Sequence, residues 1–314
     1  MKIAILGGGS WGTALAVHLA SKKHDIKMWE FFEEQAREMQ DSRVCKLLPE
    51  AKLPENIFVS HKIEDVLVDF ELVLLVVPSN HVEKTIGQAK EFVEDQAIVI
   101  CSKGFGPDLK FLTDLVKEKV SGEVYCLYGP THAEEVCKEM YSGIVLAGGT
   151  GREDLKKVFV SDNLKIDLTD DLIGVQVAAA LKNILAVFVG VLDGMGLGDN
   201  AKAYIMTRGL EEIKNVGVAL GGKEETFYGL AGIGDMIVTS TSPHSRNRSV
   251  GVEVGKGRPL KEVIDEMAMV AEGVTTLKEA MGLKEKTGLK LPLITGLHEI
   301  LFDGKDPKEV LKGI

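Results

Sequence analysis

Three glycines near the N-terminus have the spacing of a phosphate-binding turn. Gly7, Gly9 and Gly12 follow an apolar run over residues 3–6 and precede apolar residues at helical spacing. In such a strand–turn–helix unit the first glycine permits the turn, the second lets a pyrophosphate approach the backbone, and the third allows the helix to pack closely on the strand. The free N–H groups and the dipole at the helix N-terminus favour an anion there.

Glu30 supports this interpretation because it ends a second apolar run, over residues 26–29. An acidic side chain at this place in a dinucleotide-binding fold accepts hydrogen bonds from the adenosine ribose. A glycine triplet alone is compatible with an ordinary strand–helix turn. The strand before the glycines, the helix after them and Glu30 together predict a dinucleotide site.

A lysine in the middle of an apolar segment is a second group that could do chemistry. Residues 172–192 are apolar almost throughout, and Lys182 lies near their centre. Desolvation lowers the pKa of a lysine and makes it a proton acceptor near neutral pH. Ala178, Ala179 and Ala186 lie on the same helix face and leave room for a ligand. The alternative is a lysine that reaches water from the helix edge; apolar residues on both sides favour the catalytic interpretation.

Hydroxyl and guanidinium groups gather in a third stretch, which follows the glycine-rich turn 230–235 and leads into a predicted helix. The stretch contains Thr239, Ser240, Thr241, Ser242, Ser245, Arg246 and Arg248. Hydroxyls, an arginine fork and helix N–H groups together suit an anion, best a phosphate. The alternative is a solvated polar loop.

The elements that must position these groups change character near residue 170. Before it, predicted strands alternate with predicted helices; the strands cover residues 3–6, 26–29, 57–60, 72–77, 97–101, 124–128 and 144–147. Helices are predicted over residues 80–93, 108–120, 131–140 and 151–160, and Pro49 and Pro54 indicate a loop. This alternation predicts an α/β fold, a Rossmann-like doubly wound and mostly parallel sheet over residues 1–170, with ligands at the carboxyl ends of the strands. From 171 to 314 the apolar spacing is helical, with predicted helices around residues 200–220, 247–256, 274–287 and 293–302 after the segment 172–192. This spacing predicts an all-helical C-terminal domain.

Composition excludes several classes of protein. The chain has 37 basic and 47 acidic residues in 314 and no basic run, so nucleic acid is not an expected partner. The segment 172–192 is long enough to span a membrane, but Lys182 at its centre would cost about 2.5–3.5 kcal/mol there, so we expect a buried helix. The first predicted strand begins at Lys2, so we expect no signal peptide. The cysteines lack metal-site spacing, and we expect free thiols, no metal and a cytoplasmic protein.

Taken together, these motifs resemble the NAD(P)-dependent glycerol-3-phosphate dehydrogenases over nearly the full length of the chain. The matching stretches are 7–16, Val77-Pro78-Ser79, Ser102-Lys103-Gly104, Gly129-Pro130-Thr131, 180–183, Thr207-Arg208-Gly209, 230–235, 245–248 and Glu272-Gly273-Val274. The resemblance implies interconversion of sn-glycerol 3-phosphate and dihydroxyacetone phosphate with NAD(P), and reduction would supply the backbone of phospholipids.

The same resemblance implies roles for single residues. Lys182 is the proton acceptor, and Asp235 is expected to orient it and to keep it charged when reduction needs an acid. The other substrate-binding residues implied are Lys103, Gly129, Thr131, Asp235, Ser245, Arg246 and Asn247. The dinucleotide is lined by Ser10, Trp11, Phe31, Lys103, Ala133, Arg246, Val270 and Glu272. His132 stands where relatives have an aromatic apolar residue, and we expect it to stack rather than to transfer protons.

The choice of cofactor is predicted from residues 30–34. Glu30, Glu33 and Glu34 are acidic, and the arginine often found after the second strand is missing. A 2′-phosphate would meet like charge, so NAD is favoured over NADP; Phe31 or Phe32 would stack on adenine with either cofactor. The alternative is that Lys22 or Lys23 pairs with the phosphate.

Other functions remain open at this stage. A lysine-dependent 3-hydroxy acid dehydrogenase would also use a cluster that binds anions, and a catalytically silent nucleotide-binding protein would keep the fold. The sequence admits a homodimer without arguing for one.

Overall fold

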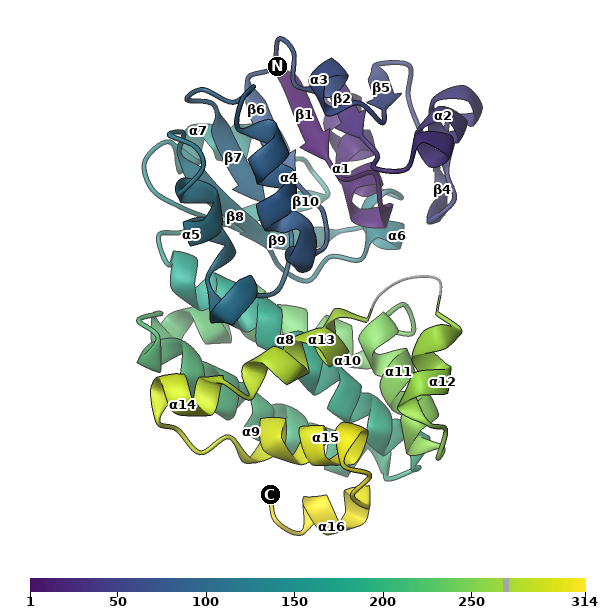
Figure 1. Ribbon diagram of the computed structural model, residues 1–314, viewed down its shortest axis with the longest axis vertical. Coiled ribbons are helices and arrows are strands. Elements are labelled where there is room, and N and C mark those ends of the chain that lie inside the picture. Colours follow the sequence, from purple (N-terminus) through teal and green to yellow (C-terminus); the bar gives the residue numbers. More distant parts are fainter. Residues whose placement is uncertain (268–270) are drawn as a thin grey trace. The chain divides into compact units, whose positions relative to one another are not determined.

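The computed structural model describes residues 1–267 and 271–314. The chain divides into two compact units, Met1–Leu172 and Ile173–Ile314 (Figure 1).

The first unit is built on an eight-stranded sheet with the order β10-β9-β8-β7-β6-β1-β2-β5. Its strands are β1 (Lys2–Leu6), β2 (Asp25–Trp29), β5 (Ile57–Ser60), β6 (Leu72–Leu75), β7 (Ala97–Ile100), β8 (Val124–Tyr128), β9 (Ser142–Ala147) and β10 (Leu164–Thr169). All neighbours are parallel except β8 and β9. The strand order reverses between β1 and β6, which is where doubly wound sheets bind their ligands. The predicted fold class is confirmed.

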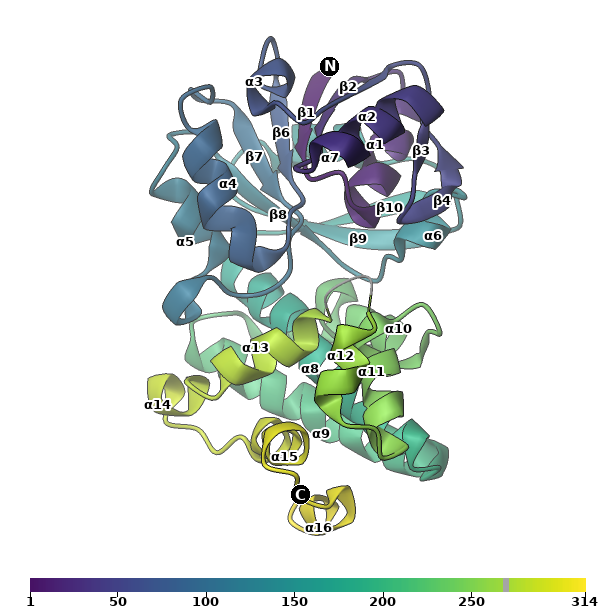
Figure 2. The same cartoon turned by 45° about the vertical axis from the view of Figure 1, so that its right-hand side comes forward.

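Helices cover both faces of this sheet (Figure 2), and the central strands are buried on both sides, as the continuous apolar runs require. The helices are α1 (Ser10–Ser21), α2 (Glu33–Ser42), α3 (Ile63–Val66), α4 (Val82–Ala89), α5 (Leu112–Lys117), α6 (Ala133–Val136) and α7 (Arg152–Phe159). The predicted helical segments 80–93, 108–120 and 131–140 are longer than the α-helices found there, because 3-10 turns and loops occupy their ends.

Two strand features were not predicted. A hairpin joins β3 (Val44–Cys45) to β4 (Leu48–Lys52), although Pro49 indicated a loop; the pair is a separate two-stranded sheet, whose edges tolerate proline. The edge strand β10 alternates buried and exposed residues and has little of the apolar signal of the central strands.

The second unit is helical throughout its described residues. Its helices are α8 (Leu172–Gly194), α9 (Gly198–Ala219), α10 (Asp235–Thr241), α11 (Arg246–Gly255), α12 (Leu260–Asp265), α13 (Glu272–Ala280), α14 (Leu283–Thr287), α15 (Pro292–Phe302) and α16 (Pro307–Leu311). A single π-helical turn, Leu230–Gly234, immediately precedes α10. The predicted helix 274–287 is two helices, and residues 239–241, which belong to the stretch rich in hydroxyl groups, form the last turn of α10.

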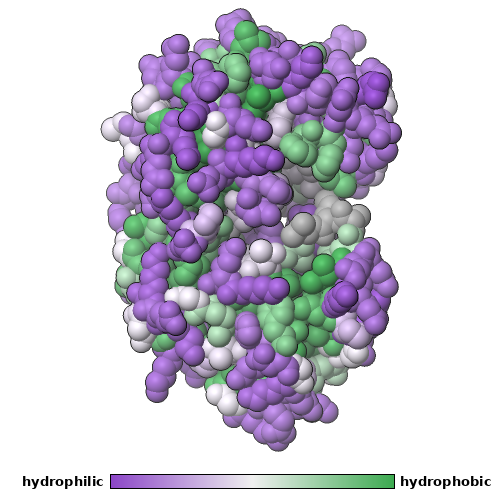
Figure 3. All heavy atoms as spheres, viewed as in Figure 1, coloured by the Kyte–Doolittle hydropathy of each residue, from purple (hydrophilic) through white to green (hydrophobic). Residues whose placement is uncertain are grey.

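Helix α8 is the core of this unit. It is long and apolar enough to cross a membrane. Its most apolar 18-residue stretch has a mean hydropathy of 2.0, but 89% of that stretch is buried within the protein, as a core helix requires. Hydrophilic side chains cover much of the face shown in Figure 3, with smaller apolar areas between them.

Glycines let α11 approach α8 at backbone distance. A Cβ on Gly251 would lie 2.0 Å from the Val187 carbonyl oxygen, and one on Gly255 would lie 2.2 Å from that of Val191. On α8, Gly190 and Gly194 would meet the backbone of α11 in the same way. Only residues without side chains permit this crossing.

A buried carboxylate from another helix caps the N-terminus of α15. Glu212 of α9 accepts hydrogen bonds from the backbone N–H groups of Leu293 and Ile294, both at 3.0 Å. Desolvation raises the pKa of Glu212, while these two hydrogen bonds act in the opposite direction. The carboxylate satisfies two N–H groups that the first turn of a helix leaves unpaired.

Candidate functional site

The glycine-rich turn of the first unit has the geometry that a bound pyrophosphate needs. Gly7 has φ +127°, and a Cβ on Gly12 would lie 1.9 Å from the Gly7 carbonyl oxygen, whereas a Cβ on Gly9 would meet nothing within 4 Å. Gly9 is the N-cap of α1 and provides no side-chain cap, so N–H groups of the first helical turn remain for an anion. Ser10 and Trp11 are half-buried in that turn. These features fit a dinucleotide.

Glu30 lies behind this turn with its carboxyl group turned inward. It is 8% exposed and accepts a hydrogen bond from the Phe32 N–H at 3.1 Å. Desolvation is the main effect and raises the pKa of Glu30, against hydrogen bonds from the backbone of Phe32, Phe31 and Gly8. The carboxyl group is therefore partly engaged by its own backbone.

An exposed aromatic pair follows Glu30. Phe31 and Phe32 are 55% and 57% exposed, and their ring centroids lie 5.1 Å apart in an edge-to-face arrangement. The ammonium group of Lys84, on α4, lies 5.5 Å from the centroid of the Phe31 ring. Lys84 was not singled out from the sequence.

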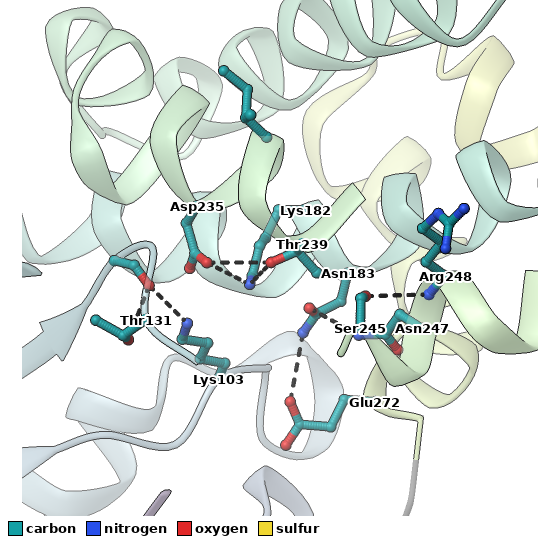
Figure 4. Close-up of polar contacts among 12 residues, drawn as sticks. Lys103, Thr131, Lys182, Asn183, Asp235, Thr239, Ser245, Asn247, Arg248 and Glu272 are labelled. Carbon is teal, nitrogen blue, oxygen red and sulfur yellow. Dashed lines mark hydrogen bonds and ion pairs between the residues drawn. The ribbon is translucent and has the colours of Figure 1, made fainter. Parts of the chain in front are cut away.

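Three predicted residues meet at the carboxyl ends of β7 and β8. Lys103 Nζ and Thr131 Oγ1 each donate a hydrogen bond of 3.3 Å to the Gly129 carbonyl oxygen (Figure 4). Gly129 has no room for a side chain, since a Cβ would lie 2.9 Å from the Cα of Ile144. Ala133 begins α6 and is buried; His132, just before it, accepts the Glu135 N–H on its backbone carbonyl.

A buried ion pair with a hydroxyl partner is the centre of the second unit. Lys182 Nζ lies 2.6 Å from Asp235 Oδ1 and 2.5 Å from Thr239 Oγ1 (Figure 4). Lys182 is 5% and Asp235 1% exposed. Asp235 begins α10 directly after the π-helical turn, and Thr239 lies one turn later on the same face. The carboxylate favours the charged ammonium, in opposition to burial.

An amide network continues from the residue after Lys182. Asn183 Oδ1 accepts from Asn247 Nδ2 at 3.0 Å, and Asn247 Oδ1 accepts from the Gly273 N–H at 2.9 Å. Asn183 Nδ2 also lies 3.5 Å from Glu272 Oε2. The network joins α8, α11 and α13, and places the predicted residues Asn247 and Glu272 beside Asn183 (Figure 4). Asn183 was not among the predicted site residues, and Thr239 was predicted only as part of the anion-binding stretch and not as a partner of Lys182.

Several polar groups of the predicted anion-binding stretch bind other groups of the protein instead. Thr241 Oγ1 donates to the Ile237 carbonyl oxygen at 2.8 Å within α10, and Arg248 binds Asp193 through Nε at 2.8 Å. Ser245 caps α11 by accepting the Arg248 N–H. Arg246 is exposed in the first turn of α11 and forms no ion pair with any residue that the structure describes.

The remaining predictions concern a metal and Val270. Among the described residues no group of histidine, cysteine, aspartate and glutamate side chains could hold a metal ion. Val270 lies outside the described residues.

Comparisons with known proteins identify the family. The model of the NAD-dependent glycerol-3-phosphate dehydrogenase N-terminus matches residues 2–153, and that of the C-terminus matches residues 171–312. The chain belongs to this family of dehydrogenases. A glycerol-3-phosphate dehydrogenase [NAD(P)+] of Thermoanaerobacter is 40% identical over 99% of this chain and 96% of its own length. One of Bacillus licheniformis is 39% identical over 100% and 93%, respectively.

Solved structures agree with this assignment. The glycerol-3-phosphate dehydrogenase of Coxiella burnetii has a TM-score of 0.96 at 32% identity, covering 99% of this chain and 98% of its own. A D-mandelate dehydrogenase with NADH has a TM-score of 0.64 at 14% identity and shares the fold alone. The resemblance to the NAD(P)-dependent glycerol-3-phosphate dehydrogenases is confirmed, and this dehydrogenase is an NAD(P)-dependent oxidoreductase.

Proposed function

We propose that this dehydrogenase interconverts sn-glycerol 3-phosphate and dihydroxyacetone phosphate, with Lys182 as the proton-transferring group. The observation that carries this proposal is the buried ion pair between Lys182 and Asp235, with the Thr239 hydroxyl against the same nitrogen. Stability alone does not account for this pair, because a buried ion pair often contributes no more to the free energy of folding than apolar side chains of similar volume.

The proton chemistry follows from these contacts. The bound nicotinamide supplies or accepts the hydride. When the alcohol is oxidised its hydroxyl proton must leave, and the neutral amine of Lys182 accepts it; in reduction the ammonium returns it. Asp235 stabilises the ammonium, and the Thr239 hydroxyl fixes the direction of the Lys182 side chain.

The other roles are proposed for each unit separately. In the second unit the N-terminus of α11, with Ser245, Arg246 and Asn247, has the N–H groups and the guanidinium that a phosphate requires. In the first unit Lys103, Gly129 and Thr131 are proposed to bind substrate. The cofactor-binding residues proposed are Gly7, Gly9, Ser10, Trp11, Gly12, Glu30, Phe31, Phe32, Lys103, Ala133, Arg246, Val270 and Glu272.

We propose NAD as the preferred cofactor, because Glu30, Glu33 and Glu34 follow β2 directly, whereas the nearest arginine, Arg37, lies further along α2. The inward turn of Glu30 reduces the repulsion that it would exert on a 2′-phosphate. The argument for NAD therefore depends more on Glu33 and Glu34, in the exposed first turn of α2, than the sequence indicated.

The cellular setting is also proposed. All four cysteines are free thiols, which supports a reducing cytoplasm. Formation of glycerol 3-phosphate for phospholipids fits the reductive direction. A homodimer stays a prediction.

Consumption of NADH or NADPH with dihydroxyacetone phosphate tests the proposal directly. We expect turnover with this substrate and none with a panel of 3-oxo acids. Turnover with the acids would support the alternative hydroxy acid dehydrogenase, and no turnover with either would support the silent nucleotide-binding protein.

A further inference from the structure

Lys84 contacts Phe31 across the point where the strand order of the sheet reverses. It lies in the first turn of α4, which follows β6, whereas Phe31 follows β2; β1 separates these two strands in the sheet. Its ammonium group is 5.5 Å from the Phe31 ring centroid. The ring itself packs edge-to-face on Trp29, with centroids 5.9 Å apart, so Phe31 and the lysine occupy a defined place at the carboxyl end of the sheet.

The ammonium group of Lys84 contacts the Phe31 ring but has no carboxylate partner among the described residues of the first unit. Lys84 is exposed and makes no ion pair with any residue in the ranges that the structure describes. The neighbouring carboxylate of Glu83 lies 3.9 Å from Lys119 Nζ. Of the two lysines that the sequence offered as alternatives, Lys22 and Lys23, the first donates to the Val160 carbonyl oxygen.

The acidic side chain at the end of β2, Glu30, does not neutralise the Lys84 ammonium group from an exposed position. The Glu30 carboxyl group is buried and accepts the Phe32 N–H. Of the three glutamates that disfavour a 2′-phosphate, only Glu33 and Glu34 are exposed.

We propose that Lys84 determines how well this enzyme accepts a phosphate on the adenosine 2′-oxygen, and so lets it use NADP(H) beside NAD(H). This rests on the cofactor site of the proposed function. An ammonium group on a flexible stem is a phosphate-binding point charge, and Lys84 lies within reach of a nucleotide bound at Phe31. Lys84 narrows the preference for NAD that Glu33 and Glu34 create.

Binding of adenosine fragments tests this without turnover. Calorimetry at low salt gives the Kd values of 5′-AMP and adenosine 2′,5′-bisphosphate for the full-length parent, for Lys84→Met and for Lys90→Met. Methionine keeps an apolar stem over Phe31. Lys90 is an exposed lysine just after the same helix and serves as the control for a change in net charge.

We expect Lys84→Met to weaken the bisphosphate about fivefold, the upper end for an exposed ion pair, and to leave 5′-AMP unchanged. Added salt should remove the difference between the parent and the variant. Lys90→Met should change neither constant. Equal losses for both fragments, or no loss for the bisphosphate, would overturn the role of Lys84. If the parent binds neither fragment nor NADH, the cofactor site itself is wrong, which is a distinct result.

Discussion

Replacing Lys182 by methionine and Asp235 by asparagine, singly and together, measures whether the two side chains act as one unit. At 2.6 Å, unit charges attract by about 6 kcal/mol at an effective dielectric constant of 20. Removing one member leaves the other buried and unpaired, which costs about 3–5 kcal/mol in comparable pairs. Removing both charges should restore much of that stability.

Catalysis should respond differently from stability. Loss of a general acid–base group lowers turnover by about 10²–10⁴-fold, so Lys182→Met should be at least that slow in single-turnover hydride transfer. If Asp235 acts only through Lys182, the double variant should be no slower than Lys182→Met alone. In Asp235→Asn the lysine loses the charge that holds its proton, so the decline of reduction with rising pH should begin at lower pH.

The assays are denaturant unfolding of the four proteins and single-turnover kinetics across pH in both directions. A Lys182→Met variant within threefold of the parent would remove Lys182 from the mechanism. A double variant that sums both single losses in stability would show that the two charges are not coupled, whatever their distance.

Three further results are expected. Arg246→Ala should lower kcat/KM for glycerol 3-phosphate far more than for unphosphorylated glycerol, since a charge-assisted contact contributes about 1.5–3 kcal/mol; an equal loss would assign Arg246 to the cofactor or the fold. Because the folded-state pKa of Glu212 is raised, the parent should lose stability as pH rises from the ordinary glutamate range through that raised value, and Glu212→Gln should lose this dependence in urea midpoints between pH 4 and 7. Gly251→Ala should destabilise by about 1–3 kcal/mol through overpacking, whereas Gly87→Ala, with open space at its Cβ, should not; equal Tm values for the two variants would contradict the close crossing of α8 and α11.

Local patterns predicted the dinucleotide-binding turn because all its parts are contiguous. The β1 strand, the three glycines and α1 need only neighbours in sequence to form. The antiparallel pairing of β8 with β9 had no such signal, since a buried strand has the same apolar run in either direction. The hairpin that contains Pro49 was hidden for the opposite reason, because its local signal favoured a loop.

Asp235 was expected as the partner of Lys182, and the structure pairs the two at 2.6 Å. The other partners of the site residues come from distant segments and could not be predicted. The apolar segment around Lys182 predicted that this lysine is buried. Nothing in the segment indicated that the Thr239 hydroxyl would lie 2.5 Å from the Lys182 ammonium nitrogen. Composition also counted Arg248 as free to bind an anion, whereas it binds Asp193 at the end of α8. Lys84 is the same case in the first unit, since its position over Phe31 depends on the pairing of strands.

The glycine crossing of α8 and α11 affects how precisely Lys182, the proposed proton-transferring group, is positioned. Lys182 lies eight residues before Gly190 on α8, which is about 12 Å along the helix axis. A tilt of about 5° at the crossing would therefore displace the lysine end of α8 by about 1 Å relative to α11, given the same axial rise. Displacements of that size can cost about a hundredfold in rate. The position of the Lys182 amine relative to the N-terminus of α11 therefore depends on glycines that carry no functional group. A methyl group added at one of them would tilt α8 against α11 and move the amine.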